Sequence, residues 1–152
     1  LARIAGVLEE LAQDLPTVFP VHPRTRDSLR RLGLAERLES LPGLHLVDPL
    51  GYLDFLKLLA HAAIVLTDSG GIQEETTALG IPCITLRDNT ERPITVSQGT
   101  NTVVGTDEYR ILACYESVMK TGGKGGRVPD LWDGKAAQRI VQVINQWAAK
   151  RP

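Results

Sequence analysis

The sequence has little cysteine, few aromatic side chains and almost no net charge. Only two cysteines occur in 152 residues, Cys83 and Cys114, and they lie far apart in apolar runs. This excludes a disulfide scaffold and offers no ligand spacing for a metal site. The 17 lysines and arginines are balanced by 18 aspartates and glutamates, a net charge of −1, which argues against a nucleic-acid partner held by bulk positive charge.

Long apolar runs are missing as well. No stretch approaches the roughly 18 uninterrupted apolar residues of a membrane span. The amino-terminal segment carries Glu9, Glu10 and Asp14 in place of the apolar block of a signal peptide. We therefore expect no membrane contact, no metal, no cofactor and a reducing, cytoplasmic location. The chain starts with Leu1 rather than Met, and within a helical pattern, which indicates a piece of a longer protein.

Short apolar segments alternate with amphipathic segments along the chain. Strands are expected at 17–21, 44–47, 63–66, 82–86 and 101–104. Helices are expected at 1–14, 24–38 with an interruption near Gly33, 52–62, 71–79 with an end at Gly80, 107–120 and 134–149. Short apolar strands separated by helices are typical of a parallel sheet covered on both faces. The pattern predicts an α/β fold, a three-layer Rossmann-like domain over residues 1–152.

The segment with the clearest chemistry is Asp68–Glu75, where an expected strand runs through Ser69, Gly70 and Gly71 into a helix. Glycines let a ligand approach the backbone, and the free N–H groups at a helix start attract phosphate together with the helix dipole. Ser69 adds a hydroxyl donor. The alternative is a plain helix cap, in which Ser69 or Asp68 accepts from the helix and the glycines only make a turn.

Charged side chains flank this expected anion site. Glu74 and Glu75 fall early in the helix, where a carboxylate either complements the helix dipole or accepts hydrogen bonds from ribose hydroxyls, and Glu75 is the candidate for the ribose. Arg87 and Arg92 bracket the loop after the fourth expected strand. A guanidinium suits a diphosphate because its planar fork binds oxygens in pairs. The alternative for each arginine is a salt bridge with a carboxylate of the same loop.

Three further positions carry weaker signals. A lone histidine is usually structural, but His22 lies at the carboxyl end of the first expected strand, between two prolines, and this placement strengthens the case for a functional role. Phe55 lies on the helix after the second strand, either as core packing or as an aromatic wall against a base. The glycine-rich segment 121–126 contains Lys124 but lacks the following Ser or Thr and the preceding strand of a P-loop, so a P-loop is rejected.

Several motifs stand together in this chain. They are TDSGGIQEE at 67–75, LGIP at 79–82, RDNTERP at 87–93, PVHP at 20–23, VDPLGY at 47–52, GTN at 99–101, and DGKAA at 133–137 followed by Arg139 and Ile140. On these residues the sequence resembles the bacterial UDP-N-acetylglucosamine 2-epimerase family. The glycine-rich loop with Lys124, and Leu131-Trp132 where many members have Tyr-Gly, depart from the commonest pattern.

The resemblance implies a particular architecture and a ligand. The chain would be the carboxyl-terminal UDP-binding domain, one half of a GT-B fold, with the amino-terminal catalytic half outside this sequence. The partner would be UDP-N-acetylglucosamine or UDP. The resemblance further implies that Ser69, Gly70 and Gly71 hold the diphosphate and that Glu75 holds the ribose hydroxyls.

It also implies roles for three more residues and a reaction. Phe55 would line the uracil pocket, Arg92 would contact the phosphates and His22 would lie near the cleft. The family inverts C2 of the sugar by eliminating UDP to a glycal and adding it back with a proton on the other face of C2, giving UDP-N-acetylmannosamine. No catalytic residue is expected in this chain, because the acid and base would lie in the other domain. The parent protein would be a cytoplasmic homodimer serving polysaccharide biosynthesis.

Three alternatives to this interpretation stay open. The first is the hydrolysing type of the same epimerase, which releases free N-acetylmannosamine. The second is a nucleotide-sugar binding module without chemistry. The third is a plain Rossmann-like scaffold whose motif loops only cap helices.

Overall fold

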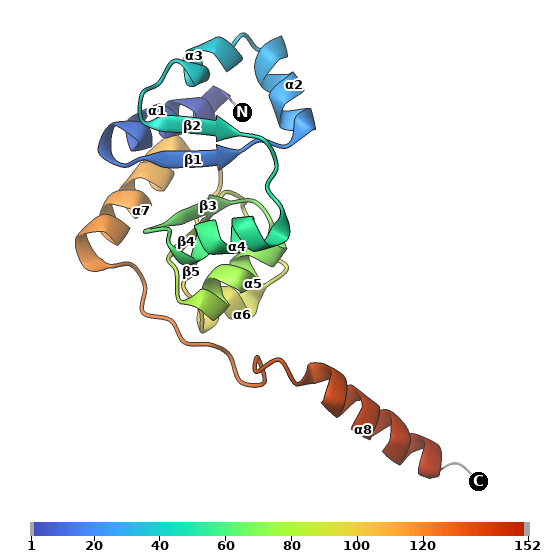
Figure 1. Ribbon diagram of the computed structural model, residues 1–152. Coiled ribbons are helices and arrows are strands. Elements are labelled where there is room, and N and C mark those ends of the chain that lie inside the picture. The colour runs from blue at the N-terminus through green and yellow to red at the C-terminus, as the bar shows by residue number, and fades with distance from the viewer. Residues whose placement is uncertain (1, 151–152) are drawn as a thin grey trace.

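The computed structural model describes residues 2–150 as a chain in which helices and strands alternate (Figure 1). The helices are α1 (Ala2–Asp14), α2 (Pro23–Arg31), α3 (Ala35–Glu39), α4 (Tyr52–Ala60), α5 (Gly70–Leu79), α6 (Pro93–Ser97), α7 (Glu108–Thr121) and α8 (Ala136–Ala149). The strands are β1 (Thr17–Pro20), β2 (Leu44–Val47), β3 (Val65–Thr67), β4 (Cys83–Thr85) and β5 (Asn101–Val103). Every helix and strand expected from the sequence is present, with slightly shifted ends.

The strands pair in parallel, as the sequence predicts. β1 pairs with β2, and β4 pairs with both β3 and β5. Within residues 2–150 the backbone hydrogen bonds form two sheets, β1-β2 and β3-β4-β5, rather than one continuous sheet. Helix α1 joins the two halves, because Val7 and Leu11 pack in the core around Ile84 while Ala5 packs in the core around Leu29.

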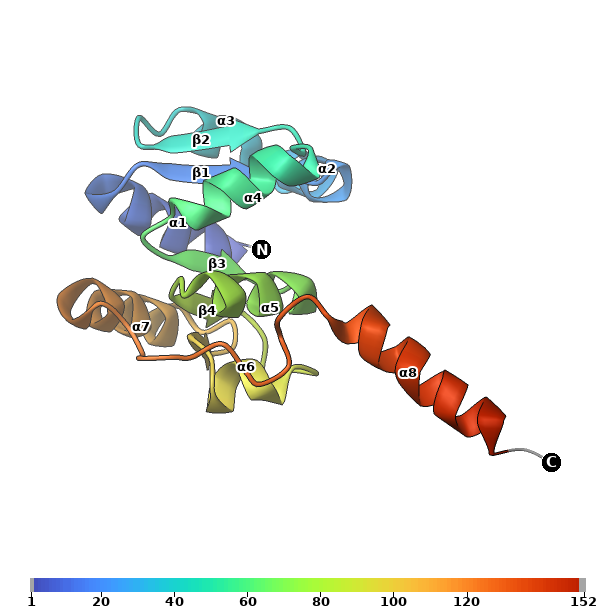
Figure 2. The ribbon, with the colours of Figure 1, turned by 60° about the horizontal axis from the view of Figure 1, so that its bottom comes forward.

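Helices cover both faces of the sheet β3-β4-β5. Consecutive side chains of a strand point to opposite faces. Ile84 packs in a core with residues of α1 and α7, whereas the hydroxyl of the next residue, Thr85, bonds Asn101, which in turn bonds Gln73 on α5. Helix α5 therefore covers one face, and α1 and α7 pack together on the other (Figures 1 and 2). The expected three-layer arrangement is confirmed for this half.

Two glycines end helices where the sequence predicts it. Gly33 has a φ of +65° between α2 and α3, and Gly80 has a φ of +73° after α5. A side chain with a Cβ is strained in this left-handed region, so glycine is favoured at both positions. Helix α6 was not expected from the sequence, although Pro93 stands at its start, where proline suits a helix.

Helix α8 extends away from the rest of the chain (Figure 2). None of its residues is buried, although Ile140, Val143 and Ile144 recur at helical spacing on one face and are each more than half exposed. Among residues 2–150 no helix is long and apolar enough to cross a membrane.

Candidate functional site

The amino end of α5 has the geometry of an anion site. The buried strand residue Thr67 accepts a hydrogen bond from the Ser69 N–H at 3.0 Å through its hydroxyl oxygen, and this holds Ser69 extended just before the helix. Within the part of the chain that the structure describes, the Ser69 side chain makes no capping hydrogen bond. Ser69 therefore occupies the amino-cap position of α5 without the side-chain hydrogen bond that the plain-cap alternative expects. The first N–H groups of the helix, at Gly70 and Gly71, have no carbonyl one turn back within the helix to bond.

A carboxylate already lies against this helix end. A Cβ added to Gly70 would come 2.5 Å from Glu91 Oε1, so a side chain at Gly70 would displace Glu91. Around Gly71 the space is open, since the nearest atom to an added Cβ is the Ser69 hydroxyl at 3.9 Å. The dipole of a helix favours negative charge at its amino end. Glu91 therefore places a carboxylate beside Gly70, on the side where a Cβ would stand.

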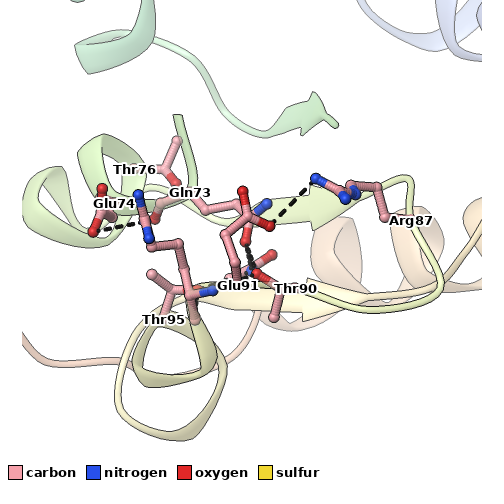
Figure 3. Close-up of polar contacts among 9 residues, drawn as sticks. Gln73, Glu74, Thr76, Arg87, Thr90, Glu91 and Thr95 are labelled. Atoms are coloured by element: carbon pink, nitrogen blue, oxygen red, sulfur yellow. Dashed lines mark hydrogen bonds and ion pairs between the residues drawn. The ribbon is translucent and has the colours of Figure 1, made fainter. Parts of the chain in front are cut away.

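Two arginines of the loop between β4 and α6 form ion pairs beside this helix. Arg92 Nε lies 3.1 Å from Glu74 Oε1, and Arg87 Nη1 lies 3.3 Å from Glu91 Oε2 (Figure 3). Arg87 thus forms a salt bridge within its own loop, which is the alternative that the sequence offered for both arginines. Arg92 instead pairs with a carboxylate of α5. Both partners of the Arg92 pair are about two fifths exposed, at 42% and 40%. Pairs this exposed contribute at most about 1 kcal/mol, so a phosphate can replace Glu74 at little cost.

Residues that the sequence did not single out connect this loop to α5. Thr90 donates through its hydroxyl to Gln73 Oε1 at 2.5 Å, and Asn101 Nδ2 donates to the same oxygen at 3.1 Å. Figure 3 shows Thr90 and Thr95 on the side of the loop and α6 that faces Gln73 on α5. Gln73, Thr90 and Asn101 each lie within one of the motifs at 67–75, 87–93 and 99–101, and those motifs are the signal that marks them in the sequence.

The remaining expected site residues are Glu75, Phe55 and His22, and each lies on or beside a different helix. Glu75 follows Glu74 on α5 and is partly buried. Phe55 is partly buried on α4, which packs against α5. His22 follows β1 in the other sheet, where its Nδ1 accepts the Arg24 N–H at 3.3 Å as the amino cap of α2. The structure gathers the α5 residues and Arg92, and it gives His22 a local capping role.

Lys124 in the glycine-rich loop has a structural function. Its ammonium donates to the Val96 carbonyl near the end of α6 and lies 3.5 Å from the Asn101 carbonyl oxygen. The Lys124 ammonium therefore contacts backbone carbonyl oxygens, in agreement with the rejection of a P-loop. Among residues 2–150 no group of three or more His, Cys, Asp or Glu side chains is placed to hold a metal ion.

The two cysteines are free and unsuited to nucleophilic chemistry. Burial raises the pKa of the Cys83 thiol at the start of β4, and hydrogen bonds with Thr76 and Thr85 oppose that shift only in part. Burial also raises the pKa of the Cys114 thiol. Since the thiolate is the reactive form, both side chains act as small apolar groups.

Comparison with known proteins identifies close relatives for almost the whole chain. The sequence model of a family described as UDP-N-acetylglucosamine 2-epimerase matches residues 1–145. The UDP-N-acetylglucosamine 2-epimerase of Methanocaldococcus jannaschii is 39% identical over 142 residues, 93% of this chain and 38% of that protein. The UDP-2,3-diacetamido-2,3-dideoxy-D-glucuronate 2-epimerase of Pseudomonas aeruginosa is 38% identical over 146 residues, 95% of this chain and 39% of that protein.

The fold is shared with solved structures. The crystal structure of Methanocaldococcus jannaschii UDP-GlcNAc 2-epimerase in complex with UDP-GlcNAc and UDP superposes with a TM-score of 0.83 at 37% identity, covering 95% of this chain and 40% of that one. This similarity confirms the predicted α/β class with parallel strands. The chain spans only 38% to 40% of the length of these relatives.

Proposed function

The chain belongs to the UDP-N-acetylglucosamine 2-epimerase family, and from this membership we propose that it binds the UDP part of a UDP-linked sugar at the amino end of α5. The observation that carries the proposal is the helix end itself. Ser69 is extended and makes no capping bond within the described residues, Gly71 is open on its outer side, and an anionic group, Glu91, already lies against Gly70.

Each part of UDP has a proposed partner. The diphosphate is held by the N–H groups of Gly70 and Gly71, by the Ser69 hydroxyl and by Arg92, which exchanges Glu74 for phosphate oxygens. Glu75 accepts the ribose hydroxyls.

Two more residues complete the proposed site. Phe55 lines the uracil pocket from the neighbouring α4, and His22 lies near the sugar at the edge of the cleft. The proposal is centred on UDP because two relatives named for different UDP-linked sugars match this chain almost equally, at 39% and 38% identity.

For the parent protein we propose the non-hydrolysing epimerase reaction on UDP-N-acetylglucosamine. A base removes the C2 proton as the bond between C1 and the UDP oxygen breaks, and UDP adds back after a proton reaches the other face of C2. The residues of this chain stabilise the negative charge on the departing diphosphate through preorganised N–H groups and Arg92. The proton-transferring residues are proposed to lie in the other half of a GT-B cleft, and the parent is proposed to be a cytoplasmic homodimer.

The test is a UDP titration of the 152-residue chain, followed by NMR because half a cleft is expected to bind only in the high micromolar to millimolar range, about −4 to −6 kcal/mol. Ser69→Ala and Arg92→Ala should each weaken binding several-fold. Arg37→Ala is the control, since the Arg37 side chain is mostly exposed and pairs with Glu9 on α1, in the other half of the molecule. Equal weakening by Arg37→Ala, or unchanged binding in Ser69→Ala and Arg92→Ala, contradicts the assigned site.

The ribose contact has a test of its own. Glu75→Gln should reduce the preference for UDP over 2′-deoxy-UDP by about tenfold, since the contribution of one charged hydrogen bond is about 1.5–3 kcal/mol. Glu74→Gln is the control and should leave that preference in place. A preference that survives in Glu75→Gln removes Glu75 from the ribose site.

The alternatives predict different products. The full-length non-hydrolysing enzyme should interconvert UDP-N-acetylglucosamine and UDP-N-acetylmannosamine, whereas the hydrolysing type should release free N-acetylmannosamine and UDP. A binding module without chemistry should do neither. The 152-residue chain by itself should be inactive, and interconversion by the purified chain would overturn the placement of the acid and base in another domain.

A further inference from the structure

The backbone of Arg92 is held by two threonine hydroxyls. Its N–H donates to Thr90 Oγ1 at 2.9 Å, and its carbonyl accepts from Thr95 Oγ1 at 2.7 Å. The loop that carries Arg92 is otherwise open to solvent, with Arg87, Asp88 and Asn89 exposed. Apolar packing therefore does little to hold this loop, and the two hydroxyls supply directional contacts to its last residue.

Both hydroxyls belong to one buried network centred on Asn101. Asn101 Nδ2 donates to Thr95 Oγ1 at 3.0 Å and to Gln73 Oε1 at 3.1 Å, and Gln73 Oε1 also accepts from Thr90 at 2.5 Å. Asn101 is thus connected to the Arg92 carbonyl through Thr95, and to the Arg92 N–H through Gln73 and Thr90. Gln73, Thr95 and Asn101 are each 0% exposed.

The same network is attached to the helix end proposed to bind phosphate. Gln73 lies one turn after Ser69, whose carbonyl accepts the Gln73 N–H at 3.3 Å. The other end of Asn101 is fixed as well, because its Oδ1 accepts from Thr85 on β4 at 2.6 Å. Buried polar groups are costly unless bonded, and a bonded network specifies one arrangement where apolar side chains tolerate several.

We propose that Asn101 is a positioning residue for the UDP site, which through Thr90 and Thr95 holds Arg92 where its guanidinium faces the amino end of α5. The proposal rests on the function proposed above. Asn101 does not contact the ligand. It sets the distance between two phosphate-binding groups, the first N–H groups of α5 and the guanidinium of Arg92.

The chain offers a matched pair of threonines for the test. Thr95 and Thr100 are both buried, and each donates its hydroxyl to a backbone carbonyl, Thr95 to Arg92 and Thr100 to Ile81 at 2.6 Å. Of these two hydroxyls, that of Thr95 bonds Arg92 and that of Thr100 bonds Ile81. Thr95→Val and Asn101→Leu therefore remove the positioning, whereas Thr100→Val removes an equivalent bond elsewhere in the same region.

Two measurements separate this proposal from the proposed function. The first is the hydrogen-exchange rate of the Arg92 amide in the unliganded 152-residue chain, and Asn101→Leu should raise it about tenfold, because local opening becomes easier. The second is the UDP affinity by NMR titration, and Asn101→Leu and Thr95→Val should weaken it about five- to tenfold, since misplacing a binding group loses affinity. Thr100→Val should change either quantity less than about twofold.

The outcomes are distinguishable. If the wild-type chain does not respond to UDP, the proposed function fails, and the exchange rates still decide whether Asn101 holds Arg92. If Asn101→Leu and Thr95→Val leave the Arg92 exchange rate unchanged, or if Thr100→Val raises it equally, the positioning role is overturned. Faster exchange of the Arg92 amide in these two variants, with an unchanged UDP affinity, overturns the positioning role too. Should Asn101→Leu fail to fold, Thr95→Val removes one hydroxyl only and serves the same test.

Discussion

The two faces of the sheet β3-β4-β5 are built from different chemistry, although the same short strands make both. The face toward α1 and α7 is aliphatic, with Ile84 in contact with Val7, Leu11 and Ile111 of one core. The face toward α5 and α6 carries Thr85 and Asn101, and Asn101 bonds both Thr85 and a side chain of each helix. A sheet covered on both faces is usually apolar on both.

The aliphatic face and the polar face of this sheet contribute to the protein in different ways. Aliphatic packing stabilises the fold without direction, since it depends on the area removed from water. Hydrogen bonds stabilise less per group but depend on angle and distance. Among residues 2–150 the buried polar side chains all lie within the segment from Thr67 to Asn101, which also carries the proposed UDP site. We infer that the polar face is the one that sets the geometry of the site.

The largest effect on stability is expected on the aliphatic face. Ile84→Ala should lower the free energy of unfolding by about 2–5 kcal/mol, because Ile84 is fully buried and its loss leaves a cavity. Urea unfolding measures this, and UDP affinity of the folded protein should be unchanged. A loss below about 1 kcal/mol would show that the aliphatic face is not the main source of stability.

A smaller effect on stability, accompanied by weaker binding, is expected for the next residue on the opposite face. Thr85→Val keeps the shape of the side chain but leaves Asn101 Oδ1 without the donor it has at 2.6 Å. The expected cost is about 1–3 kcal/mol, the penalty of a buried unpaired acceptor. Thr106→Val is the control, because Thr106 is exposed and should change little. If Thr85→Val costs stability but leaves UDP affinity intact, the two faces do not differ in function.

Glycine-to-alanine variants sharpen the comparison further. Gly70→Ala should change stability by less than about 1 kcal/mol, since the added methyl displaces only the flexible end of Glu91 and alanine favours the helix. It should still weaken UDP binding, because the methyl lies at the proposed phosphate site. Gly80→Ala is the control at the other end of α5. Its left-handed φ of +73° should cost about 1 kcal/mol without affecting UDP.

The smallest effect is expected outside both faces, before α8. A hydrogen bond from Arg139 at 2.9 Å, with a second from the Lys135 N–H, lowers the pKa of Asp133 from its ordinary value of 3.8. The folded form therefore favours the ionised carboxylate. The contribution of the ionised Asp133 to the stability of the folded form is complete above the pKa of Asp133 in the unfolded chain. It is lost as the pH falls through the lowered pKa of the folded form.

This pH effect should be local. The Cα chemical shifts at the start of α8 should report a loss of helix in strongly acidic solution, and Arg139→Gln should move that loss to higher pH. The UDP site should not respond to Arg139→Gln at neutral pH. A pH response of α8 that is identical in the variant would show that the pair with Arg139 does not hold this turn.

Much of the secondary structure follows from local pattern. Helix α1, the break at Gly33 and the end of α5 at Gly80 were predictable because hydrophobic spacing and glycine conformations act over a few residues. Helix α6 was not, because its five residues have no hydrophobic period, and its first turn depends on bonds to the Arg92 carbonyl. The pairing of the strands was not predictable from local pattern either, because it joins residues distant in sequence, such as Thr17 and Leu44.

The site divides in the same way. Ser69, Gly70 and Gly71 could be proposed as an anion site from the sequence, because a strand followed by a glycine-rich turn and a helix is a local arrangement that favours anions. The partner of Arg92 was not. The sequence left a phosphate and a carboxylate of its own loop as the alternatives, whereas the structure pairs it with Glu74 on α5.

By itself the sequence determined the α/β class, the order of the elements, the family and the helix end proposed for UDP. Each of these follows from residue spacing over a few positions or from motifs that can be recognised in the sequence alone. Only the tertiary structure decided that Asn101 joins Gln73 to Thr95, and that Glu91 lies over Gly70. Those contacts join residues from separate elements, and their geometry exists only once parallel strands bring those elements to the same side of the sheet.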